Sequence, residues 1–224
     1  MGSVAAEAWI ASVRQLGGSP EAAVAGAAEL DRRYAEPRRR YHGASHVDQV
    51  VRDSSWLGAE LGLDADERAW LSLAAAAHDV VYEARPGDDE RASAAWARRQ
   101  LEASGVAAES IDRVVALVLA TATHAAPAGD TVAIALLDAD LAILGTDPDG
   151  YERYVAAVRQ EYAAVPDDQW RVGRSDVLAG LLRRDRIFVS RAGCRRWEAP
   201  ARANVGAELA RLRDRGKRPG DHRP

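Results

Sequence analysis

The sequence predicts an all-α protein, and three observations lead to this class. Apolar residues recur three and four positions apart along most of the 224 residues, which is the spacing of one helix face. The alternation of apolar and polar residues that marks a half-buried strand is nearly absent. Hydrophobic residues make up 47% of the chain, with much alanine and leucine and one phenylalanine. We therefore expect a single-domain helical bundle over residues 1–215.

Glycine, proline and capping residues divide this pattern into helices. Gly17 and Gly18 end the first helix, and Ser19 caps the second. Pro20 suits the first turn of that helix because its ring already holds a helical φ. Repeating this reasoning along the chain predicts helices over residues 4–16, 20–34, 44–61, 64–82, 89–103, from after 105 to near 124, 131–144, 150–162, 174–184 and 197–213. The basic segment 216–224 is expected to be a disordered tail.

Charge and composition exclude several functional classes. The formal net charge is −4, from 34 acidic and 30 basic residues, which gives no general attraction to nucleic acid or to an anionic membrane. The single cysteine cannot form an internal disulfide. We find no signal-peptide pattern and no apolar run of the roughly 20 residues that a bilayer crossing needs. A cytoplasmic protein without nucleic-acid or membrane partners is expected, and its oligomeric state stays open.

The first candidate for chemistry is the doublet His78-Asp79. In a helix over 64–82, His78 shares the apolar face of Leu71 and Ala74, and Asp79 lies about 100° further round. An imidazole beside a carboxylate suits Zn²⁺, Mn²⁺ or Fe²⁺ better than Ca²⁺. Taken alone, the doublet is better explained as a core histidine with a solvated neighbour.

A second candidate is Asp140, which lies in the apolar stripe of Leu136, Leu137 and Leu144. A buried carboxylate without a partner is unfavourable, so it binds a proton, an arginine or a metal ion. His46 and His124 lie on apolar faces of two further predicted helices. Four such groups on separate helices favour one shared metal site over unrelated buried side chains.

The order of these residues resembles the HD superfamily of metal-dependent phosphohydrolases. Its signature is a histidine, a His-Asp doublet and a later aspartate, each from a different helix of a bundle, and His46, His78-Asp79 and Asp140 match it. A branch of small bacterial proteins, predicted metal-dependent HD phosphohydrolases, is similar over roughly residues 30–210. The local matches are Arg39, Tyr41-His42 and His46; His78-Asp79-Val80-Val81-Tyr82; Glu90 with Ser93-Ala94; Thr121 with His124; Leu137-Asp138-Ala139-Asp140-Leu141 with Leu144-Gly145; Arg159; Glu161-Tyr162; Arg174 with Leu178; Glu198; Ala201-Arg202; and Asn204.

The resemblance implies an HD-type helical domain with one divalent metal ion held by His46, His78, Asp79 and Asp140. Mn, Zn, Fe, Co, Ni and Mg are all open. The implied reaction is attack by metal-bound water on the phosphate ester or anhydride of a small substrate, which could be a nucleotide.

Further roles follow from this chemistry as hypotheses. A guanidinium matches phosphate oxygens in a fork, so Arg39 would bind the phosphate, with Arg159 and Arg174 as further candidates. His124 would transfer a proton or orient the water, with Asp79 and Arg39 as the other catalytic groups. His42 and Glu90 would support the ligands or line the substrate site. Each arginine could equally form a structural salt bridge.

Two other functions stay open on the sequence. HD-type oxygenases with two irons need additional histidines between the doublet and the last aspartate, where this chain has only His124. A metal-binding or nucleotide-sensing domain without turnover would carry the same ligands.

Overall fold

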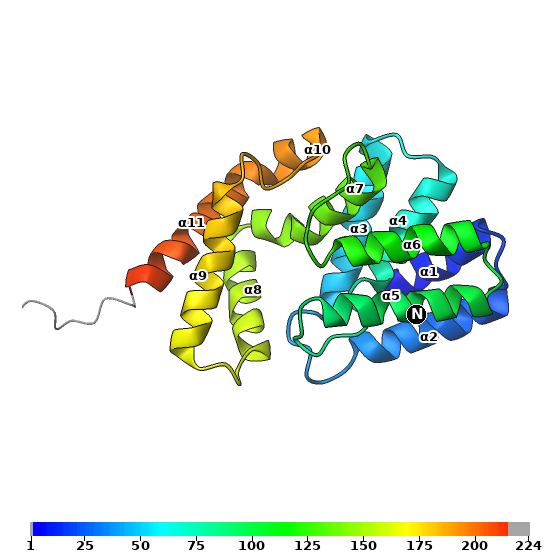
Figure 1. The fold of residues 1–224 in the computed structure, drawn as a ribbon, viewed down its shortest axis with the longest axis horizontal. Helices are drawn as coiled ribbons and strands as arrows, with labels where there is room; N and C mark the ends of the chain where they lie inside the picture. Colours follow the sequence, from blue (N-terminus) through cyan, green and yellow to red (C-terminus); the bar gives the residue numbers. More distant parts are fainter. Residues whose placement is uncertain (1, 215–224) are drawn as a thin grey trace, which may run out of the picture. The chain divides into compact units, whose positions relative to one another are not determined.

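The computed structural model describes residues 2–214, and this range contains helices and no strand (Figure 1). The all-α prediction is confirmed. The elements in chain order are α1 (Val4–Gln15), α2 (Pro20–Tyr34), α3 (Ala44–Glu60), α4 (Ala65–Ala77), α5 (Asp88–Ala103), α6 (Ala108–Ala120), α7 (Thr131–Leu141), the 3₁₀ turn η1 (Ala142–Gly145), α8 (Pro148–Glu161), α9 (Asp167–Arg183), α10 (Arg191–Gly193), the π-helical turn η2 (Cys194–Glu198) and α11 (Ala199–Asp214). The predicted tail 216–224 lies outside the described residues.

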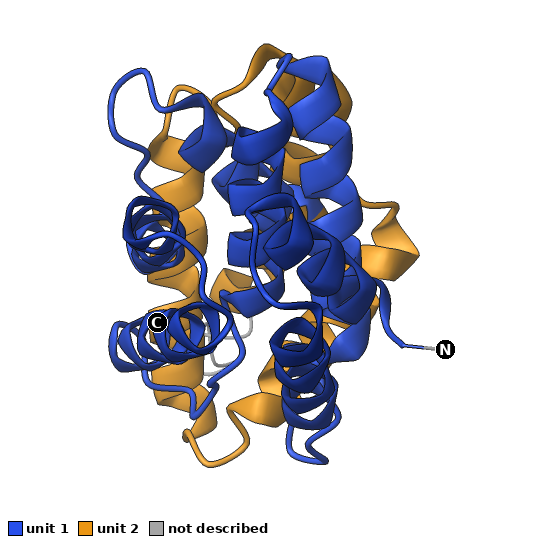
Figure 2. Ribbon diagram, turned by 90° about the vertical axis from the view of Figure 1, so that its right-hand side faces the viewer, with its two compact units in different colours: residues 1–142 blue, residues 143–224 orange. Residues whose placement is uncertain are grey.

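The helices group into two compact units, Met1–Ala142 and Ile143–Pro224 (Figure 2). The single domain expected from the sequence stays a prediction. All four predicted metal ligands belong to the first unit.

Helix α4 forms the core of the first unit and packs against α1, α3, α6 and α7. It begins at a capping box in which Asp64 and Glu67 bind each other's backbone N–H groups. The four alanines from Ala74 to Ala77 are fully buried, and their small side chains let the neighbouring helices approach closely. The end of α4 therefore lies in a buried environment, which matters because the His-Asp doublet follows it.

Three helix boundaries differ from the prediction by four residues or more. Helix α4 ends at Ala77 instead of residue 82, because the chain turns tightly there and the N–H of Val80 bonds to the Ala77 carbonyl. Helix α6 ends at Ala120, ahead of His124. Helix α9 begins at Asp167, seven residues before the predicted start, because Pro166 and the acidic first turn favour a helix N-terminus there.

In the second unit, α9 packs against α11, and a buried polar network links these two helices to α8. The Nε of Arg174 donates to Glu208 Oε1 at 2.8 Å, and the hydroxyl of Tyr151 donates to Glu208 Oε2 at 2.5 Å. Burial and the nearby Glu208 carboxylate both raise the pKa of Tyr151, so its hydroxyl stays protonated as the donor. This network stabilises the packing of the second unit.

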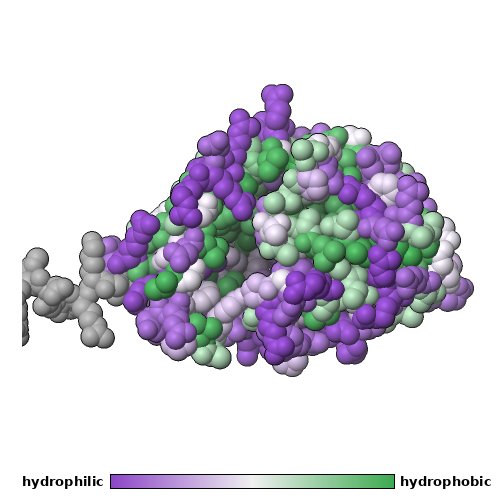
Figure 3. All heavy atoms as spheres, in the orientation of Figure 1, coloured by the Kyte–Doolittle hydropathy of each residue, from purple (hydrophilic) through white to green (hydrophobic). Residues whose placement is uncertain are grey.

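On the surface, hydrophilic side chains cover much of the face in Figure 3, with apolar ones among them. The large apolar residues exposed on the described part of the chain are Val24, Leu119, Val172, Val177 and Val189. Isolated exposed valines are ordinary for a folded protein and mark no binding site. Within residues 2–214, no helix has both the length and the apolar character that spanning a bilayer requires.

Candidate metal centre

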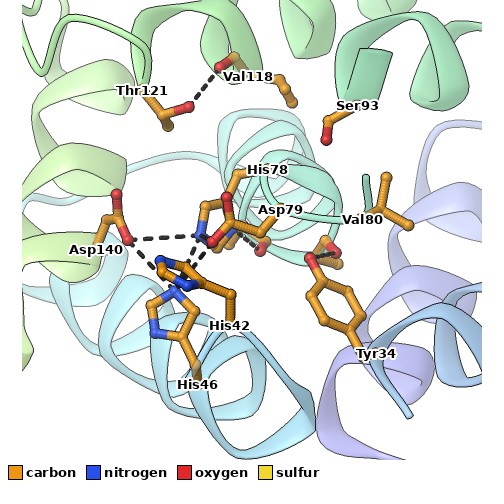
Figure 4. Close-up of polar contacts among 12 residues, drawn as sticks. Tyr34, His42, His46, His78, Asp79, Val80, Ser93, Val118, Thr121 and Asp140 are labelled. Carbon is orange, nitrogen blue, oxygen red and sulfur yellow. Dashed lines mark hydrogen bonds and ion pairs between the residues drawn. The ribbon is translucent and has the colours of Figure 1, made fainter. Parts of the chain in front are cut away.

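Three helices bring the predicted ligands together. His46 lies in the first turn of α3, His78 caps the end of α4 with Asp79 following it, and Asp140 lies near the end of α7. Helix α4 packs against both α3 and α7, so all three segments meet. Figure 4 shows the four side chains pointing toward one another.

The distances between the ligand atoms are short and similar. His46 Nε2 lies 3.2 Å from His78 Nε2 and 3.4 Å from Asp79 Oδ2. His78 Nε2 lies 3.1 Å from the same Asp79 oxygen. Asp140 Oδ1 lies 3.5 Å from each of the two imidazole nitrogens. The ligand atoms of His46, His78 and Asp140 all fall within 4.8 Å of one another.

This spacing fits a metal ion. With metal–ligand bonds of about 2.1 Å, adjacent ligand atoms lie about 3.0 Å apart in an octahedral site and about 3.4 Å apart in a tetrahedral one. The five distances between the imidazole nitrogens and their neighbours, from 3.1 to 3.5 Å, cover this range. Two imidazoles and two carboxylates also form a donor set that divalent transition metals favour. The residues could therefore hold one divalent ion.

Burial and charge hold the cluster in an unusual protonation state. Burial opposes the charged form of His78, but the carboxylates of Asp79 and Asp140 outweigh it and raise its pKa well above the usual value. Burial also opposes ionisation of the two aspartates, yet the charge of His78 keeps the pKa of each below its usual value. Burial lowers the pKa of His46. Without metal, the geometry thus favours a protonated His78 and a neutral His46 between two carboxylates.

The orientation of the His78 ring is set by its own helix. Nδ1 lies 2.8 Å from the Ala75 carbonyl. A carbonyl only accepts hydrogen bonds, so Nδ1 carries a proton and Nε2 faces the other predicted ligands. A histidine ligand usually needs such a contact to fix its tautomer.

His124 lies beside the cluster and contacts Asp140. Its Nε2 is 3.0 Å from Asp140 Oδ2, so Asp140 faces the two imidazole ligands with one oxygen and His124 with the other. The side chain of His124 is 32% exposed, and solvent can therefore reach it. Its backbone has φ of 48°, in the left-handed region that is strained for a residue other than glycine. Such strain is frequent where a side chain must be aimed at a functional site.

Arg39 has a different placement from the predicted phosphate contact. Its side chain is 1% exposed, and its Nη1 and Nη2 groups donate to the carbonyls of His42, Asp79 and Val80. These hydrogen bonds point the guanidinium at the backbone around the doublet. The phosphate contact expected for Arg39 gains no support from this arrangement and stays a prediction, because the guanidinium is 1% exposed and already binds three carbonyls.

His42 and Glu90 also have defined contacts. The His42 ring stacks on Tyr82, with 4.2 Å between the ring centroids, and meets the His46 ring edge-on at 5.6 Å. This placement favours support of the ligand His46. Glu90 accepts a hydrogen bond from the Gly87 N–H at 2.5 Å and so stabilises the start of α5. Its expected contact with substrate gains no support from this arrangement.

Arg159 and Arg174 belong to the second unit, where both guanidinium groups bind acceptors of that unit. Arg159 contacts the Tyr162 and Val165 carbonyls and pairs with Asp167 at 2.5 Å. The side chain of Arg174 is 9% exposed and pairs with Glu208. These contacts match the structural salt bridges considered as alternatives, and the phosphate contacts of the two arginines stay predictions.

Two residues beside the centre were not singled out from the sequence. The hydroxyl of the buried Tyr34 donates to the Ala76 carbonyl at 3.0 Å, just before the doublet. Asp89 is buried and accepts hydrogen bonds from the N–H groups of Glu83 and Arg85, which shapes the loop after the doublet. A tyrosine at a helix end and one acid among three give little sequence signal of such roles.

Comparison of the chain with protein-family models, with curated proteins and with solved structures found no match. The relation to the HD superfamily thus stays a resemblance based on the ordered residues of the sequence. The convergence of His46, His78, Asp79 and Asp140 is an independent observation from the structure.

Proposed function

We propose that the first unit binds one divalent metal ion through His46, His78, Asp79 and Asp140 and hydrolyses a phosphate ester or anhydride of a small molecule. The observation that carries the proposal is the set of short, similar distances from two buried imidazoles to each other and to two carboxylates. The resemblance to metal-dependent phosphohydrolases adds the reaction class.

When bound, a divalent ion at this place would lower the pKa of water and offset negative charge on a phosphoryl group. His46 and His78 supply neutral nitrogen ligands, and Asp79 and Asp140 supply the negative charge that balances the ion. The hydrogen bond from His78 Nδ1 to the Ala75 carbonyl keeps the ligand nitrogen turned inward.

His124 is suited to proton transfer in this reaction. It reaches the ligand Asp140 at 3.0 Å and is partly open to solvent, so a proton can pass between its ring and the surroundings. An imidazole ring can donate a proton to a leaving oxygen and can accept one from water.

A phosphate-release screen tests the proposal. Metal-loaded wild type is assayed on p-nitrophenyl phosphate, its bis ester, sugar phosphates, cyclic nucleotides and nucleoside mono- and triphosphates. We expect turnover on at least one substrate class and its loss in Asp79→Ala, with helical content retained. The matched control is Asp112→Ala, because Asp112 lies on the exposed side of α6 and pairs with Arg98.

Other outcomes would identify the alternatives. Metal binding without phosphate release from any substrate would favour a sensor domain. Two irons per chain with oxygen uptake would favour an HD-type oxygenase. Full activity in Asp79→Ala would remove the proposed mechanism.

A further inference from the structure

The loop between α2 and α3 places one arginine beneath the proposed metal centre. Arg39 Nη1 donates to the carbonyl of Asp79 at 2.7 Å and to that of His42 at 2.9 Å, and Nη2 donates to the Val80 carbonyl at 2.8 Å. Nε donates to Glu36 at 3.3 Å. Four hydrogen bonds to protein acceptors, in a side chain that is 1% exposed, commit this guanidinium to the interior.

Two of the three carbonyls that Arg39 binds, those of Asp79 and Val80, lie just beyond the end of α4, which stops at Ala77. Carbonyls in such a turn have no N–H group of a continuing helix to bind and need another donor. A guanidinium satisfies several such carbonyls at once because its N–H groups form a planar fork. The Tyr34 ring, 5.1 Å from the guanidinium carbon, and the Tyr82 ring at 5.8 Å add favourable contacts with the cation.

The same guanidinium also holds the segment that leads to His46. Arg39 binds the carbonyl of His42, and the next residue, Gly43, is the N-cap of α3. The carbonyl of Gly43 accepts the N–H of His46 at 3.1 Å. One side chain therefore joins the segment before His46 to the segment that carries His78 and Asp79. Arg39 and Asp79 themselves are 40 positions apart in the sequence.

We propose that Arg39 is a positioning residue of the metal centre: it fixes the backbone of Asp79 and of the segment before His46, so that their side chains meet at metal-binding distance. The inference rests on the proposed metal site and assigns Arg39 no contact with substrate. Metal sites tolerate only about 0.2 Å of error in ligand distance. A lysine has three donors on one point charge in place of the planar fork and cannot bind all four acceptors of Arg39.

Titration of the purified protein with Co²⁺ tests this role, because visible absorption of bound Co²⁺ reports its coordination. Outer contacts of metal ligands usually change affinity about 10- to 100-fold, and we expect Arg39→Lys to bind Co²⁺ more weakly by that factor and with a changed spectrum. The matched control Arg32→Lys, on an arginine that is 67% exposed, should bind like wild type. Wild-type failure to bind Co²⁺ would count against the metal site itself, and equal binding by wild type and Arg39→Lys would overturn only the role of Arg39.

Kinetics separate positioning from a phosphate contact. If Arg39 is a positioning residue, Arg39→Lys should have a lower kcat than wild type at subsaturating metal. This kcat should recover as metal is added, and the KM for substrate should stay nearly unchanged. Unchanged Co²⁺ affinity together with a raised KM would show that Arg39 binds the phosphate and would overturn the inference.

If Arg39→Lys does not fold, Arg39→Ala is measured with methylguanidinium in the buffer. The small cation should fill the vacated space and restore both helical content and Co²⁺ binding. Recovery of folding without recovery of Co²⁺ binding would contradict the proposal.

Discussion

Removing one charge from the centre, by Asp140→Asn, gives the sharpest expectation. Asparagine keeps the size of the side chain, and its amide can still contact His124, which lies 3.0 Å from Asp140 Oδ2. The substitution removes the negative charge of a side chain that is 14% exposed and whose Oδ1 lies 3.5 Å from both imidazole nitrogens. Breaking a buried charge pair by removing one partner costs about 3–5 kcal/mol. At about 1.4 kcal/mol per tenfold change, the dissociation constant for metal should rise about 100- to 5,000-fold.

The assay is competition for Zn²⁺ against a chromophoric chelator, with circular dichroism as the check on folding. Asp112→Asn is the matched control, since it makes the same chemical change on a side chain that is 67% exposed. A dissociation constant for Asp140→Asn within threefold of wild type would show that this carboxylate is not a ligand. The reasoning from the ligand distances would then fail.

Three further predictions concern protons, stability and strain. Because the pKa of His78 is raised, binding of a metal ion must displace about one proton from His78 at pH 7. The affinity for metal should therefore rise about tenfold per pH unit until the pH passes that pKa. Calorimetric heats of binding that do not depend on the buffer would contradict this prediction. Glu208→Gln removes a buried carboxylate and leaves the 9% exposed Arg174 side chain without its charge partner. Urea unfolding should show a loss of about 3–5 kcal/mol in the free energy of unfolding while Zn²⁺ affinity stays unchanged, and a loss under 1 kcal/mol would show that the network does not stabilise the second unit. His124→Gly removes the strain of a left-handed backbone and should raise the melting temperature while lowering turnover. Ala84→Gly removes the same strain at φ of 55° and should raise the melting temperature without affecting turnover. Equal turnover in the two glycine variants would remove the role of His124.

The sequence predicts much of this fold because the capping residues and prolines that start its helices act on neighbouring residues of the chain. Ser19 and Pro20 start α2 within the chain itself, and the Asp64 capping box does the same for α4. The polar ligands stand out for a similar reason, since Asp140 and His46 interrupt apolar helix faces. The observed convergence agrees with the prediction that these side chains share one place.

The end of α4 could not be predicted in this way. Apolar periodicity continues through Val81 and Tyr82, so local pattern favours a longer helix. The helix stops at Ala77, and the carbonyls beyond it bind Arg39, which is distant in sequence. A charged residue also suggests a solvent-exposed position, and only the fold shows that Arg39 is buried. Tertiary contacts of this kind decide both the exact boundary and the role of the arginine.

Crystals of the protein soaked with Zn²⁺ would test the central claim most directly, because Zn²⁺ binds such sites more tightly than Mn²⁺ or Co²⁺ and gives anomalous scattering. We predict one anomalous peak per chain, at about 2.0–2.2 Å from the Nε2 atoms of His46 and His78 and from carboxylate oxygens of Asp79 and Asp140. A peak held by other residues, or none at saturating Zn²⁺, would contradict the account.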